Sequence, residues 1–201
     1  ANDSTGLYQS YAGATTPGQQ FFLMGDAWIT YRVSEMTKHQ LKYRWLHVNN
    51  GFDNEQDSYT NNHTADYSVQ LKMDSIGLSK LKIIPGFYST SVDSKGGLYT
   101  AADASGQNTS SNVAAFIEVQ NTLWDKLNLS TGMRYESYWL NSERFSKPVF
   151  HFGANYELNI KTFLRANYGQ GFRFPTIAER YTKTSVGTFN IFPNPKLEPE
   201  T

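Results

Sequence analysis

The feature that most constrains this chain is a strict alternation of apolar and polar residues, clearest over residues 127–139. Successive side chains of a β-strand point to opposite faces, so this stretch predicts a strand with one apolar face. One face would carry Leu127, Leu129, Thr131, Met133, Tyr135 and Trp139, with Ser137 as the exception, and the other Asn128, Ser130, Gly132, Arg134 and Glu136.

The same period of two recurs along the rest of the chain and predicts nine strands without a long helix. It is distinct at 113–123, 150–158 and 164–169, and weaker at 6–12, 21–32, 39–49, 64–74 and 79–92. We therefore expect an all-β fold of antiparallel strands.

The connections between these strands alternate in length. Short connections are expected at 34–38, 75–80, 125–126 and 159–161, and longer polar ones at 13–20, 50–63, 93–111 and 140–147. Outer-membrane barrels alternate short turns at one end with longer loops at the other, whereas sandwich connections mix lengths. The alternation favours an up-and-down transmembrane β-barrel segment.

The composition fits two kinds of β-protein. Aromatic residues make up 15% and hydrophobic residues only 39%, which suits either a membrane barrel or a polar, carbohydrate-binding sandwich. Trp28, Tyr31, Trp124 and Trp139 lie near predicted strand ends, where a membrane barrel has aromatic girdles, although aromatic residues favour strands in general. No run of 18 apolar residues predicts a transmembrane helix.

Signatures of catalysis or cofactor binding are missing from the sequence. It has no common hydrolase, metalloprotease or nucleotide-binding motif, no Cys, and four histidines without metal-ligand spacing. We therefore expect no enzyme activity, no bound metal and no cofactor. The zero net charge argues against a nucleic-acid partner.

An acidic stretch, Asp53 to Asp57, places carboxylates at alternate positions. A calcium loop of the EF-hand kind would need Gly at its sixth and Glu at its twelfth position, where this chain has Ser58 and Thr64. A solvated acidic loop is the favoured interpretation, with a calcium site as the alternative.

Four charged residues fall on the polar faces of neighbouring predicted strands: Glu118, Arg134, Glu136 and Arg165. In a barrel they would face the lumen. Paired charges that hold the wall together are the favoured interpretation, and direct contact with a substrate is the alternative.

Three segments from Asn112 onward, "NVAAFIEVQNTLWDKLNLSTGMRYESY", "HFGANYELNIKTFLRANYGQGFRFPTIAERY" and "NPKLEPE", resemble segments of TonB-dependent outer-membrane receptors. The first is similar to a hairpin of that family, with Gly132, Arg134 and Tyr135 on its pattern. The family's Phe-Arg-x-Pro box is matched by Phe172, Arg173, Pro175 and Glu179, and its Asn-Pro-x-Leu-x-Pro-Glu box by Asn194, Pro195, Leu197, Pro199 and Glu200. Between the boxes, "PTIAERY" predicts a short helical turn, and Pro193, Pro195 and Pro199 predict an extended path outside the sheet.

The resemblance implies a 22-stranded barrel in the bacterial outer membrane, filled by a plug that couples to TonB. Nine strands are too few to close that barrel, so residues 1–201 are expected to form part of the barrel domain, with the plug absent. The box residues would then have structural roles.

The implied function is active transport of a scarce ligand, with the TonB complex, the ligand and outer-membrane lipid as partners. The haem branch of the family carries a His between the two boxes, and no His lies between Pro175 and Asn194 here, which argues against haem as the ligand. An iron–siderophore complex is expected because such ligands are the most frequent in the family. A soluble all-β glycan-binding module is the alternative.

Overall fold

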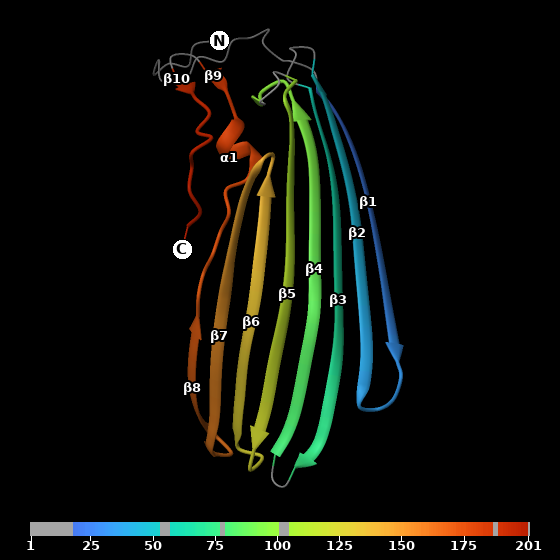
Figure 1. Cartoon of the computed structure of the whole chain (residues 1–201), viewed down its shortest axis with the longest axis vertical. Coiled ribbons are helices and arrows are strands. Elements are labelled where there is room, and N and C mark those ends of the chain that lie inside the picture. The colour runs from blue at the N-terminus through green and yellow to red at the C-terminus, as the bar shows by residue number, and fades with distance from the viewer. Residues whose placement is uncertain (1–17, 53–56, 77–78, 101–104, 187–188, 201) are drawn as a thin grey trace, which may run out of the picture.

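The computed structural model describes residues 18–52, 57–76, 79–100, 105–186 and 189–200. Eight long strands form its main sheet (Figure 1). They are β1 (Gly18–Arg32), β2 (Thr37–Phe52), β3 (Ser58–Ile76), β4 (Ser79–Gly96), β5 (Gln107–Leu123), β6 (Leu127–Leu140), β7 (Glu143–Asn159) and β8 (Thr162–Gly169).

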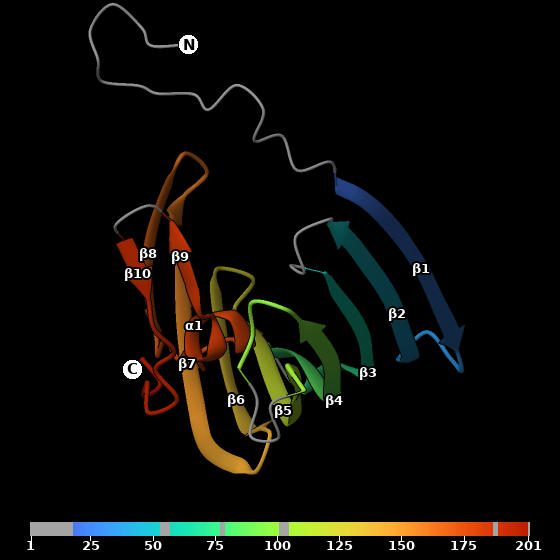
Figure 2. The ribbon, with the colours of Figure 1, turned by 90° about the horizontal axis from the view of Figure 1, so that it is seen from above.

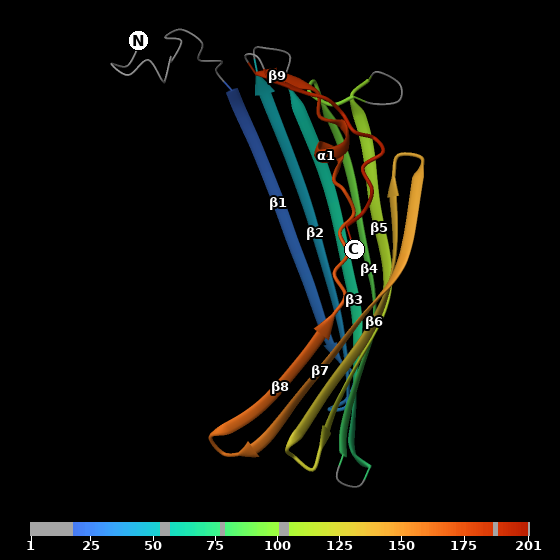
Figure 3. The same ribbon diagram turned by 90° about the vertical axis from the view of Figure 1, so that its left-hand side faces the viewer.

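Each strand of the sheet pairs antiparallel with its neighbours in the sequence, in the order β1 to β8. The antiparallel up-and-down prediction is confirmed, and each strand predicted from residue 21 onward is present. The ninth predicted strand, 6–12, lies outside the described residues. Seen from above, the strands follow an arc (Figure 2), and seen from the side their directions rotate progressively from β1 to β8 (Figure 3), as the right-handed strand twist requires.

The sheet has one apolar and one polar face, as the alternation predicted. We call the face of Ile117, Met133 and Phe150 the outer face, and the face of Glu118, Arg134 and Glu136 the inner face. Ile117, Met133 and Phe150 are cross-strand partners in a single row, each 43–45% exposed. Large apolar side chains thus lie exposed across the outer face of the sheet.

One proline explains a gap in the ladder between β3 and β4. The paired residues run from Ser58↔Gly96 to Ser68↔Gly86 and resume at Leu71↔Ile83, so the pairing lapses beside Pro85. Proline has no N–H to donate, which accounts for the lapse.

The connections alternate less regularly than expected. At the end of the sheet that we call the turn end, Lys126 N donates to Leu123 O (3.0 Å) across a turn in which Trp124 and Asp125 both have positive φ. At the opposite loop end, the predicted long connection 140–147 is wrong, because β6 ends at Leu140 and β7 begins at Glu143. Residues 143–147 are polar except for Phe145, so no alternation of apolar residues indicates a strand there.

After β8, residues 170–186 and 189–200 form a segment that we call the strap. It contains the helix α1 (Ile177–Tyr181) and the two short strands β9 (Thr184–Val186) and β10 (Phe189–Ile191), which pair with each other. The helix confirms the predicted helical turn. In Figure 2 it lies on the concave side of the arc. Within the described residues, no helix is long and apolar enough to cross a membrane.

The small core of the chain lies between the strap and the inner face near the loop end. Leu140 (0% exposed), Ala114 and Ile177 are its buried apolar residues. Polar residues are buried with them: Asn108, Asn112, Glu136 and Arg180. The strap is therefore packed onto the inner face.

Candidate functional site

Two of the four predicted lumen residues, Arg134 and Glu136, form an ion pair on the inner face of β6. Asn112 of β5 donates from Nδ2 to Glu136 Oε2 (2.8 Å), and Glu136 is only 7% exposed. The Arg134 guanidinium also lies over the Tyr88 ring, 4.7 Å from its centroid. A buried carboxylate needs such partners to stay charged. This part of the wall fits the paired-charge interpretation.

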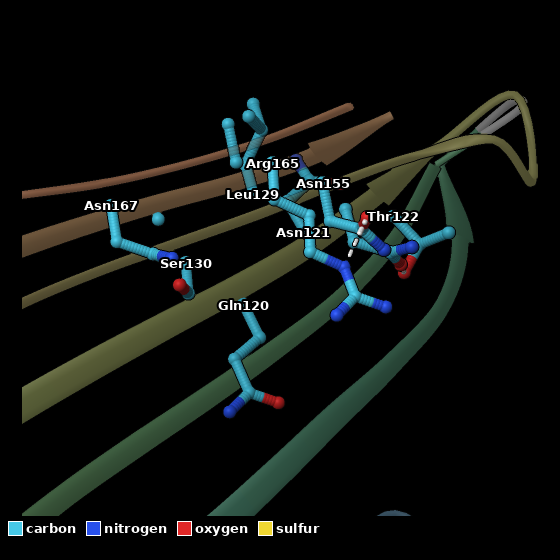
Figure 4. Close-up of a pocket in the computed structure, with 11 residues that line it drawn as sticks. Gln120, Asn121, Thr122, Leu129, Ser130, Asn155, Arg165 and Asn167 are labelled. Carbon is cyan, nitrogen blue, oxygen red and sulfur yellow. Dashed lines mark hydrogen bonds between the residues drawn. The ribbon is translucent and has the colours of Figure 1, made fainter. Parts of the chain in front are cut away.

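The other two, Glu118 and Arg165, lie on the same face but nearer the turn end. Glu118 accepts a hydrogen bond from Gln120 Nε2 (2.5 Å). Arg165 donates from Nε to Asn155 Oδ1 (3.3 Å), the dashed line in Figure 4. Arg165 lines an open groove of about 220 Å³ whose other polar residues are mostly amides and hydroxyls: Gln120, Asn121, Thr122, Asn128, Ser130, Asn155 and Asn167. The four residues share one face without forming one cluster.

Aromatic rings hold the start of the strap to the inner face. Phe172 stacks on Phe145 (5.2 Å between ring centroids), and Phe174 stacks on Tyr138 (5.3 Å). Tyr138 and Phe145 are cross-strand partners in β6 and β7. Phe172 of the first box thus contacts the wall directly, and Phe174 extends that contact.

The two family boxes, far apart in the sequence, meet through Arg173. Its backbone pairs with Glu200 in both directions, with N–O distances of 3.1 and 3.0 Å. Its guanidinium forms ion pairs with Glu179 and Glu200. Glu179 in turn caps α1, because its carboxylate accepts from Thr176 N (2.8 Å) while Thr176 Oγ1 accepts from Glu179 N (3.3 Å). We call Arg173, Glu179 and Glu200 the clasp.

The remaining box residues shape the strap around this clasp. Pro175 is buried immediately before the helix cap, Asn194 O accepts from Leu197 N (3.1 Å) in a turn, and Pro195 and Pro199 lie outside any strand. The structural roles predicted for these box residues stay predictions.

Arg180 is the buried anchor of the strap, at 4% exposure. It pairs with Glu143 of β7 and donates from Nε to Leu197 O (3.0 Å), and its guanidinium lies 5.3 Å from the Phe174 ring centroid. From sequence, Arg180 was only a good helix former. The signal that could have marked it is its place three residues after Ile177, which puts both on one face of the helix.

The strap is also joined to the connection between β4 and β5. Thr100 N donates to Tyr181 O (2.9 Å), Lys183 N donates to Leu98 O (2.8 Å), and Tyr99 pairs with Thr182. The strap therefore bridges β6 and β7 on one side and this connection on the other.

Trp28 lies where sequence reasoning did not expect it. Its proposed place in an outer girdle is wrong, because Trp28 pairs with Lys42 and so shares the inner face with Asp26 and Arg44. Tyr31, three residues on, lies on the outer face. The opposite parity of positions 28 and 31 was visible in the sequence and would have separated them.

Metal-binding groups are not evident among the described residues, where no three of His, Asp and Glu gather around one point. Of the acidic stretch, residues 53–56 lie outside the described part, and Asp57 Oδ1 accepts from Phe52 N (2.6 Å).

Comparisons with known proteins agree with this architecture. Residues 2–201 match the family model described as TonB dependent receptor-like, beta-barrel. A double mutant of the Serratia marcescens hemophore receptor HasR, solved in complex with its hemophore HasA and heme, is similar in fold, with a TM-score of 0.69 and 15% sequence identity. The match covers 92% of this chain and 35% of that chain, so the chain spans about a third of that receptor's length. No curated protein matches the sequence.

Proposed function

Because the chain belongs to the TonB-dependent receptor-like β-barrel family, we propose that it is a wall of an outer-membrane transporter that imports a scarce ligand into a bacterium. The proposed ligand is an iron–siderophore complex. The proposed energy source is the TonB complex, acting through a plug domain outside the described residues. The chain itself would bind and conduct rather than catalyse.

The contrast between the two faces carries this proposal. Ile117, Met133 and Phe150 expose apolar side chains in one outer row, as a wall in contact with lipid does. The inner face opposite them carries the Arg134–Glu136 pair and the polar groove at Arg165. A soluble glycan-binding module would have no use for an exposed apolar face of this extent, which disfavours that alternative.

The siderophore part of the proposal rests on the frequency of such ligands in the family, and the sequence argues only against haem. No His lies between Pro175 and Asn194. The hemophore receptor with a similar fold shares 15% identity, a level at which likeness supports the fold and not the ligand.

Uptake in cells tests the proposal. Deletion of the gene that encodes the complete receptor should abolish uptake of a radioactive iron chelate and slow growth under iron limitation, and inactivation of TonB should have the same effect. Unchanged uptake of every iron chelate tried, with binding of an oligosaccharide instead, would contradict it.

A further inference from the structure

Residues 98–100, at the start of the connection between β4 and β5, are paired with the strap. Thr100 donates two hydrogen bonds to Tyr181 O, one from its backbone N (2.9 Å) and one from its hydroxyl (3.2 Å). Lys183 N of the strap donates in the other direction, to Leu98 O (2.8 Å). The two segments thus form a small ladder of their own, separate from the main sheet.

A buried asparagine of β5 ties residues 98–100 to the sheet. Asn108 is 1% exposed, and its Nδ2 donates to Thr100 O (3.2 Å). Its Oδ1 accepts from Asn141 Nδ2 (2.9 Å) in the turn between β6 and β7, which fixes the direction of the Asn108 amide. In the described part of the chain, the other hydrogen bond from residues 98–100 to the sheet is a local turn at Gly96. Thr100 is therefore the residue at which sheet, connection and strap meet.

The strap is held to the sheet beside the same turn. Arg180 pairs with Glu143, which is the first residue of β7 and lies two positions after Asn141. The aromatic stacks of Phe172 and Phe174 add to this attachment from the beginning of the strap. The attachments of both segments therefore converge on the turn between β6 and β7.

The number of these bonds decides what separates first when the strap leaves the sheet. Residues 98–100 make three hydrogen bonds to the strap and one, from Asn108, to β5. Hydrogen bonds between uncharged groups contribute similar free energies, so the single bond should break before the three. The base of the connection stays closed by a bond from Gly96 N to Gly106 O (3.3 Å). Gly97, directly beyond that base, gives the chain the freedom to rotate there.

Resting on the proposed function, we propose that the strap and residues 98–100 detach from the sheet together, as one unit, each time the receptor admits a ligand. The bonds from Thr100 to Tyr181 persist in the closed and in the open arrangement. The bond from Asn108 and the ion pair of Arg180 exist only in the closed arrangement, which is the one in this structure.

Hydrogen exchange of the complete receptor in detergent, resolved to single amides, tests the coupling without reference to transport. Arg180→Met removes the ion pair that holds the strap to the sheet, and proteolysis registers its release. The amides of Thr100 and Lys183 should still exchange at nearly the wild-type rate, because their bonds lie within the unit. Thr100→Pro removes the donors of two of the three bonds and is the matched comparison, in which the Lys183 amide should exchange about tenfold faster.

Two cross-links in living cells test the movement itself, and the chain has no Cys that would interfere. Tyr99 and Thr182 are partners in an antiparallel bridge, a spacing that suits a disulfide. Tyr99→Cys with Thr182→Cys, once oxidised, joins the strap to residues 98–100 and should import iron at the wild-type rate. Glu143→Cys with Arg180→Cys, joined by a short bismaleimide, holds the strap to the sheet and should abolish import. The radioactive probe is whichever of ferrichrome, ferric enterobactin and ferric citrate the wild type imports.

Three outcomes would overturn the inference while leaving iron transport intact. The first is exchange of the Lys183 amide that is as fast in Arg180→Met as in Thr100→Pro. The second is import that stops when the Tyr99→Cys and Thr182→Cys pair is oxidised and returns with dithiothreitol. The third is undiminished import with the strap linked to Glu143→Cys. A wild type that imports none of the three chelates would refute the proposed function instead, and the exchange rates would still decide whether the two segments are coupled.

Discussion

Gly132 shows how a single missing side chain shapes the inner face. A Cβ at this position would lie 2.1 Å from Cε1 of His151, the partner residue on β7. The His151 ring therefore occupies the space above Gly132. The family pattern includes a glycine here, and the structure supplies a steric reason for it.

Gly132→Ala should destabilise the folded chain by about 1–3 kcal/mol, because the ring must move or the strands must separate. The denaturant midpoint of the refolded receptor measures the loss. Gly169→Ala is the matched control, since Gly169 pairs with the same His151 and a Cβ there meets nothing within 4 Å. Adding His151→Ala to Gly132→Ala should restore most of the lost stability. A double variant as unstable as Gly132→Ala alone would refute the steric explanation.

Residue roles on the inner face were only partly predictable from sequence. Alternation assigned Arg134 and Glu136 to one face, because a period of two needs no knowledge of the partner strands. It could not show that Asn112 completes their network, since that depends on the register between β5 and β6. The inner-face position of Trp28 was readable by the same parity rule.

At the scale of elements, helix α1 depends on its reciprocal cap. Thr176→Ala removes the acceptor of the Glu179 amide hydrogen and should cost about 1 kcal/mol. Hydrogen exchange of the amides in residues 177–182 should accelerate about fivefold. Thr176→Ser keeps the hydroxyl and should exchange at nearly the wild-type rate. If these amides exchange in Thr176→Ala at the wild-type rate, packing alone holds the helix.

The strap as an element depends on Arg180. Arg180→Met keeps most of the side-chain volume but removes the ion pair with Glu143 and the hydrogen bond to Leu197 O. A hydrogen bond to a charged group contributes about 1.5–3 kcal/mol, so the strap should become cleavable by protease at concentrations that spare the wild type.

Lys196→Met is the control for Arg180→Met, because it removes an exposed cation from the same strap. Proteolysis followed by mass spectrometry locates the cuts. Cleavage of both variants at the same rate would contradict an anchoring role for Arg180.

Elements were predictable where apolar residues alternate along one face of a strand, and not where that alternation is missing. The strand over 127–139 was found almost to the residue, since β6 runs from Leu127 to Leu140. The first residues of β7, from Glu143 to Lys147, contain a single apolar residue, Phe145, so the hydropathy of the sequence does not indicate that they pair with β6. The contact between Arg173 and Glu200 was likewise out of reach, because it joins two segments 27 residues apart without any period between them.

For the whole molecule, the assignment of faces predicts that lysine introduced on the outer face costs much more folding stability than lysine introduced on the inner face. Ile117→Lys places a charge in the middle of the outer row, which should cost about 2–4 kcal/mol if that row lies at the centre of a bilayer. Gln120→Lys, three residues further along β5 on the inner face, should cost little. Folding of the two variants into lipid vesicles, followed by tryptophan fluorescence, measures the difference. Equal losses would contradict the assignment of the outer face to lipid.

The fold class of the whole chain followed from its sequence because up-and-down pairing joins only neighbouring strands. Turn signals such as Asp125-Lys126 therefore predict which strands pair as well as where each strand ends. The curvature of the sheet and the docking of the strap depend on side chains far apart in the sequence, and no local pattern encodes them.

The strap also has a consequence for the order of events in time. Every hairpin of the sheet closes a short stretch of chain, whereas the bond from Thr100 to Tyr181 joins residues 81 positions apart. Longer closures cost more entropy, and this one has nothing to dock on until β5, β6 and β7 are in place. The hairpins should thus form first, and the strap should dock last on the completed sheet. Under mild denaturation the strap should detach from the sheet before any two strands separate.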